Sequence, residues 1–171
     1  MTESLDLDRA RDLNGRGRYL WLRRVLLCAL AVVPVLALLN VFGQDSSNAT
    51  ATSPTASITV HSPERVRGGL LYEARFTIKA IQDIKQLTLV LSDGWAQGLT
   101  INTIEPSPSN ETSDNGALSF QLGELKAGGV FVLHMEFQVN PTTVGSRKQE
   151  VEVDDGNAPV VSLTRNFAVL P

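Results

Sequence analysis

The stretch GVFVLHMEFQVN, residues 129–140, alternates apolar and polar side chains with a period of two. One side of such an extended chain carries Phe131, Leu133, Met135, Phe137 and Val139. The other side carries Val132, His134, Glu136 and Gln138. Since successive side chains of a strand point to opposite faces of a sheet, this pattern predicts a β-strand with one buried face.

The same period recurs in both directions along the chain. Further strands are predicted at 56–60, 70–80, 85–92, 99–104, 117–125, 147–156 and 160–170. Turn-forming Gly, Pro, Asp and Asn residues separate them, and no sustained helical period occurs after residue 58. Strands with one apolar face need a second sheet to cover them, so we expect an all-β fold, an antiparallel immunoglobulin-like sandwich of about seven to eight strands over 58–171. The Cys…Trp…Cys core of antibody domains is missing.

The N-terminal part is different in character. Residues 25–42 contain no charged side chain, and Tyr19 and Trp21 precede them. Eighteen helical residues reach about 27 Å, close to the hydrocarbon thickness of a bilayer. We expect a transmembrane helix over 19–42 that is retained as a single-pass signal-anchor. A cleaved signal peptide with a site near Val41-Phe42-Gly43, and a buried core helix, are the alternatives.

The distribution of charge predicts the orientation in the membrane, and the composition predicts the segments on either side of the span. Six Arg residues precede the apolar run, and no Lys or Arg follows it until Arg65. The positive-inside rule therefore places the N-terminus in the cytoplasm and the sandwich outside the plasma membrane. We expect a disordered tail over 1–18, and a flexible Ser/Thr/Ala-rich stalk over 43–57 that leads to the sandwich.

Three segments carry a resemblance to a known class of domain. These are LLYEARFTIKA (70–80), SDGWAQGLTINTIEPSPSN (92–110) and LSFQLGELKAGGVFVLHMEFQVN (118–140), with the turn 125–129 ahead of the long strand. Their order resembles the bacterial immunoglobulin-like domains of the conserved-repeat and CARDB type, over residues 66–156. The whole chain is similar to uncharacterised single-span envelope proteins of actinobacteria. The resemblance implies a surface interaction module and no catalytic residue.

Several chemistries find no support in the sequence. The single Cys, Cys28, lies in the apolar run, so the soluble part has no disulfide and no thiolate ligand. His61 and His134 are isolated histidines without further metal ligands nearby in the sequence, and we interpret them as solvated. The soluble part is acidic with scattered Lys and Arg, which argues against nucleic acid. No serine elbow or phosphate-binding loop occurs. We therefore predict no enzyme activity and no cofactor.

Two candidate sites are left. Acidic residues gather at Glu150, Glu152, Asp154 and Asp155, a weak calcium candidate that is better interpreted as an edge strand protected by charge. A possible interaction loop carries Trp95, Gln97 and Glu105. Trp95 either covers the open end of the core or is an exposed anchor for a partner.

Three hypotheses about function follow. The first is a non-enzymatic membrane-anchored envelope protein whose sandwich binds a neighbouring membrane protein, another envelope protein or a wall component. The second is an accessory domain that binds a solute or an ion. The third, an anchored enzyme of unknown class, has the least support because no acid/base pair or nucleophile constellation occurs.

Overall fold

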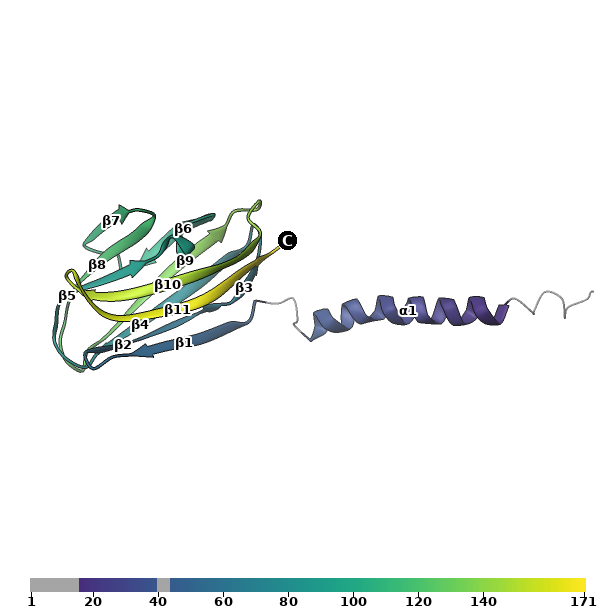
Figure 1. The fold of residues 1–171 in the computed structure, drawn as a ribbon, viewed down its shortest axis with the longest axis horizontal. Coiled ribbons are helices and arrows are strands. Elements are labelled where there is room, and N and C mark those ends of the chain that lie inside the picture. Colours follow the sequence, from purple (N-terminus) through teal and green to yellow (C-terminus); the bar gives the residue numbers. More distant parts are fainter. Residues whose placement is uncertain (1–15, 40–43) are drawn as a thin grey trace, which may run out of the picture. The chain divides into compact units, whose positions relative to one another are not determined.

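A computed structural model describes residues 16–39 and 44–171 of the chain (Figure 1). The chain forms two compact units, Met1–Gly43 and Gln44–Pro171. The first unit contains the helix α1 (Arg16–Leu38), which includes Pro34. The predicted span began at residue 19, so three residues of the expected tail are helical, while residues 1–15 and 40–43 lie outside the described part.

The second unit is the predicted all-β sandwich. Its first sheet holds, in spatial order, β1 (Ser46–Thr52), β2 (Ala56–Pro63), β4 (Leu71–Ala80), β9 (Val130–Val139) and β6 (Leu99–Glu105). The second sheet holds β3 (Arg65–Arg67), β11 (Ala158–Leu170), β10 (Gly145–Asp155), β5 (Ile84–Leu91), β8 (Ala117–Leu125) and β7 (Asn110–Asp114). Neighbouring strands are antiparallel except for the short β3, which runs parallel to β11. The fold class predicted from the sequence is confirmed.

The alternation in the sequence gives the two inner faces of the sandwich. In β9, Leu133, Met135, Phe137 and Val139 are buried, and Phe131 packs against them from a partly buried position. Strand β4, the neighbour of β9 in the same sheet, adds to this inner face Tyr72, Ala74, Phe76, Ile78 and Ala80, all buried as the pattern predicted. The rings of Tyr72 and Phe137 stack with centroids 5.3 Å apart. The core lies between the two sheets, and the strands with the strongest periodicity, β4 and β9, supply much of one of its faces.

The described chain has eleven strands, three more than the eight segments predicted, and the additional ones are β1, β3 and β7. Strand β1 lies within the segment 43–57 that was expected to be a flexible stalk. It pairs with β2 along its whole length, and Asn48 bonds to His61 (2.7 Å) while Thr50 bonds to Thr59 (3.0 Å). Small hydroxyl and amide side chains thus hold an edge strand that contains no large apolar residue.

One long side of the sandwich is closed by contacts between the sheets. Strand β11 lies against β1 and β2 of the opposite sheet. The Arg165 side chain of β11 is buried and donates hydrogen bonds to the Ser62 hydroxyl and to the Pro63 carbonyl oxygen (2.6 Å). Burial lowers the pKa of this guanidinium. The guanidinium group of Arg165 therefore connects the two sheets on this side.

Candidate functional site

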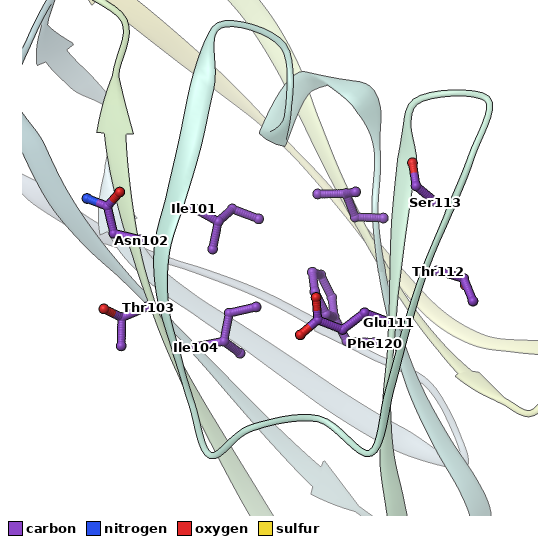
Figure 2. Close-up of a pocket in the computed structure, with 9 residues that line it drawn as sticks. Ile101, Asn102, Thr103, Ile104, Glu111, Thr112, Ser113 and Phe120 are labelled. Atoms are coloured by element: carbon purple, nitrogen blue, oxygen red, sulfur yellow. The ribbon is translucent and has the colours of Figure 1, made fainter.

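The other long side of the sandwich is open. Strand β6 is the last strand of one sheet, and β7 is the last strand of the other. A groove of about 410 Å³ lies between β6 and the β7–β8 hairpin (Figure 2). It runs along two sheet edges whose outward backbone groups have no neighbouring strand in the described chain.

Apolar side chains form the floor of the groove. Ile101 and Ile104 come from the inner face of β6, and Leu118 and Phe120 come from the inner face of β8. Phe120 is 2% exposed, while the other three are only partly buried because no further strand covers them. The floor is thus the edge of the core itself, accessible from outside.

Polar side chains surround this floor. Asn102 and Thr103 line the groove from β6, and Glu111, Thr112 and Ser113 line it from β7. Glu111 pairs with Phe120 in the register of β7 and β8, so the two side chains share the inner face of that sheet. Figure 2 shows the Glu111 carboxylate pointing into the space between the strands. The site therefore combines an apolar floor with hydrogen-bonding groups and one carboxylate.

The predicted interaction loop is not brought together. Strand β6 separates Gln97 from Glu105, and a strand of seven residues spans about 20 Å. Both residues are exposed, Gln97 before the strand and Glu105 at its end. Trp95 has no exposed surface, so its ring is not available to a partner in this structure.

Trp95 belongs to the core. This position agrees with the first role considered from the sequence, in which the ring covers the open end of the core, and not with an exposed anchor. Its ring lies 5.3 Å from the Phe76 ring and 5.4 Å from the Phe137 ring, measured between centroids. The short 3-10 turn η1 (Asp93–Trp95) directs the side chain inward. Arg165 lies over the indole with its guanidinium carbon 6.0 Å from the ring centroid, within the range of a cation–π contact.

The acidic candidate lies on β10. This strand lies between β11 and β5, so it is interior to its sheet and the interpretation as an edge strand was wrong. Glu150, Glu152 and Asp154 alternate with the buried Gln149, Val151 and Val153 and share the outer face. Asp155 accepts a hydrogen bond from the Gln86 backbone N–H (2.8 Å). Within residues 16–39 and 44–171, no group of three or more His, Cys, Asp or Glu could hold a metal ion. A calcium site here stays a hypothesis without structural support.

The carboxyl group of Asp154 has a raised pKa. Partial burial, and secondarily the nearby Glu152, raise the pKa of Asp154 to about 6. One of its carboxylate oxygens is buried without a hydrogen-bond partner among the described residues. A carboxylate in this position is destabilised, which explains the direction of the shift.

The two histidines lie on the outer face of the first sheet. His134 forms a 2.6 Å hydrogen bond with Glu73, and His61 is bonded to Asn48. Strand β4 separates them, and Arg75 is in register with both. Each histidine thus has its own partner, and neither lines the groove.

The apolar helix meets the length and composition of a membrane span. Its window Tyr19–Leu38 has a mean hydropathy of 2.0 and none of it is buried. A helix that is apolar on all faces is typical of a span or a signal sequence, whereas a core helix is mostly buried.

Comparison with protein families and with curated proteins finds no match. Among solved structures, the sandwich is similar to the CARDB domain of a Pyrococcus furiosus protein, with 17% identity, 73% of this chain and 89% of that chain covered, and a TM-score of 0.43. The reeler domain of human F-spondin matches with 12% identity, 64% and 83% coverage, and a TM-score of 0.44. A non-cellulosomal cohesin from Archaeoglobus fulgidus matches with 12% identity, 63% and 86% coverage, and a TM-score of 0.40.

The similar structures thus include the CARDB type of domain that the sequence resembles. At these identities the likeness concerns the fold alone. The similarity to actinobacterial envelope proteins stays a prediction.

Proposed function

We propose that this chain is a non-enzymatic, membrane-anchored binding module whose sandwich takes a protein partner in the groove between β6 and β7–β8. The helix α1 is the anchor, retained after insertion, with the N-terminus in the cytoplasm and Gln44–Pro171 outside. Hydropathy and the asymmetric distribution of Arg around the span support this arrangement.

The observation that carries the proposal is the accessible apolar floor. Ile101, Ile104 and Leu118 lie on inner faces of the sandwich, yet the sheets end before covering them. A concave apolar surface with convergent polar groups is the usual form of a binding site. Two open strand edges beside it supply backbone donors and acceptors, which a polypeptide can use and which most other ligands use less fully.

An apolar solute is the second candidate, because a volume of about 410 Å³ falls within the ~300–1,000 Å³ of small-molecule sites. Figure 2 shows the groove bounded by β6 on one side and by the β7–β8 hairpin on the other. We favour the polypeptide since the length of both strands is accessible to an extended chain.

Photo-cross-linking in native membranes tests the proposal. A photoreactive amino acid is placed at Asn102 on the groove rim, and the matched control position is Thr77 on the outer face of β4. The proposal expects a cross-linked polypeptide from position 102 and none from position 77. Cross-links only to lipid, glycan or a small solute, or equal yields at the two positions, contradict it.

A further inference from the structure

The net negative charge of the domain comes from the part of the sequence that contains the groove-forming strands. Between Gln86 and Leu125 there are five acidic residues and no Lys, Arg or His. These acidic residues are Asp93, Glu105, Glu111, Asp114 and Glu124. The rest of the domain, residues 44–85 and 126–171, carries nine acidic and nine basic side chains. The excess of negative charge therefore lies in the segment that includes β6, β7 and β8. Glu124 is paired with Lys126, and Glu111 is the one acidic residue among those that line the groove, which favours a cationic ligand there.

Glu111 brings this charge into the groove. Its side chain is exposed and forms no ion pair or hydrogen bond with any described residue, although it stands opposite Phe120 on the apolar floor. A carboxylate next to an apolar surface forms stronger ionic hydrogen bonds than one in bulk water. The position fits a Lys or Arg that belongs to the ligand.

The two edges differ in how well they accept another strand. The ladder between β6 and β9 is irregular between Ile101 and Thr103, and such bulges hinder further pairing. The ladder between β7 and β8 is regular from Asn110 to Asp114. An extended segment therefore fits best along β7, with its inward side chains over Phe120 and beside Glu111.

From these observations we infer that the partner presents an extended basic segment, in which an apolar side chain covers the floor and a Lys or Arg pairs with Glu111. This inference rests on the proposed function and names the chemistry of its partner. Complementary charge sets the specificity and speeds the encounter, while the apolar contact supplies most of the lifetime of the complex.

Three capped peptides of equal length are the probes. Their repeats are Val-Val-Lys-Lys, Val-Val-Glu-Glu and Ser-Ser-Lys-Lys, so that each face of the extended peptide carries both residue types. The full chain is held in nanodiscs of phosphatidylcholine, a zwitterionic lipid without net charge, and binding is measured by fluorescence anisotropy with empty nanodiscs as the blank. We expect the Val-Val-Lys-Lys peptide to bind at least about tenfold more tightly than either comparator. Rising salt should weaken that binding.

Two variants make the assignment specific. Glu111→Gln should weaken binding of the Val-Val-Lys-Lys peptide roughly three- to fivefold, the range of an exposed ion pair. Glu136→Gln, an equal charge change on the outer face of β9, should weaken it less than about 1.5-fold. Glu111→Lys should reverse the preference toward the Val-Val-Glu-Glu peptide. Thermal melts check that each variant is folded.

The possible failures are distinguishable. Equal binding of the Lys and Glu peptides, or equal effects of the two Gln variants, overturns the basic-segment inference. If position 102 still cross-links a polypeptide in that case, the proposed function survives. Loss of both the peptide binding and the cross-link contradicts the proposed function itself.

Discussion

Gly94 lies against the backbone of Lys148, so closely that a Cβ on Gly94 would stand 2.0 Å from the Lys148 carbonyl oxygen. This contact brings η1 against β10. Ser92 reinforces it, because its N–H donates to the Glu150 carbonyl and its hydroxyl accepts from the Glu150 N–H, both at 3.0 Å. Trp95 enters the core as a consequence of this approach.

Replacing this glycine should therefore disturb the core. Gly94→Ala forces η1 away from β10, and because the obstacle is backbone we expect a loss of about 3 kcal/mol or more in the free energy of unfolding, the upper end for overpacked sites. Gly128→Ala is the control, because Gly128 has a positive φ of 80° but open space around it. Its cost should be only about 1 kcal/mol. Denaturant unfolding followed by circular dichroism measures both, and equal losses would contradict the contact.

Trp95 itself should matter for stability and not for partner contact. Trp95→Ala removes a side chain with no exposed surface, and we expect a cost of about 3–5 kcal/mol. The exposed neighbour Gln97 serves as the control, since Gln97→Ala should change unfolding by less than about 0.5 kcal/mol. A Trp95→Ala protein that melts normally would return this residue to the surface role considered from the sequence.

The raised pKa of Asp154 predicts the sign of a pH dependence in the stability of the domain. Its pKa is raised from 3.8 to about 6 in the folded state, so folding favours the protonated carboxyl. This residue's contribution to stability is most favourable below pH 4 and is lost as the pH rises through 6. Asp154→Asn should therefore melt at a higher temperature than the wild type at pH 7–8 and should show no such gain near pH 3.5. Thermal scans across this range check it, and a gain independent of pH would rule out the titration.

Much of the sandwich could be predicted from the sequence, because large apolar residues at every second position mark strands with one buried face. The strand β1 was missed since Ser, Thr and Ala give no such contrast, and β7 was missed since all five of its residues are exposed. The inward position of Trp95 depends on the contact between Gly94 and the backbone of Lys148. These two residues are far apart in the sequence, so the sequence alone does not show that they meet.

The groove was not predicted for a related reason. Ile101, Ile104, Leu118 and Phe120 have the pattern of ordinary core residues, and only the order of strands shows that the sheets end beside them. The sequence did contain one usable signal. The absence of any Lys, Arg or His from Gln86 to Leu125 singles out the segment that forms the groove.

The membrane arrangement is open to a direct check. A reporter that is active only after export, fused behind Pro171, should be active, and the full-length chain should stay with membranes after a carbonate wash. The physical reason is the apolar window Tyr19–Leu38, together with the Arg residues at its N-terminal end and before it. A silent reporter contradicts the orientation. A soluble product that begins near Gln44 would show that the helix is a cleaved signal.

Hydrogen–deuterium exchange tests the central claim, that the groove is the binding surface, most directly. The full chain in nanodiscs is compared with and without a saturating Val-Val-Lys-Lys peptide or the partner segment recovered by cross-linking. The account predicts slower exchange in the amides of β7 (Asn110–Asp114) and β6 (Leu99–Glu105), with unchanged exchange in β1 (Ser46–Thr52) and β2 (Ala56–Pro63). Protection confined to β1 and β2, or none in β6 and β7 while the ligand is bound, would contradict it.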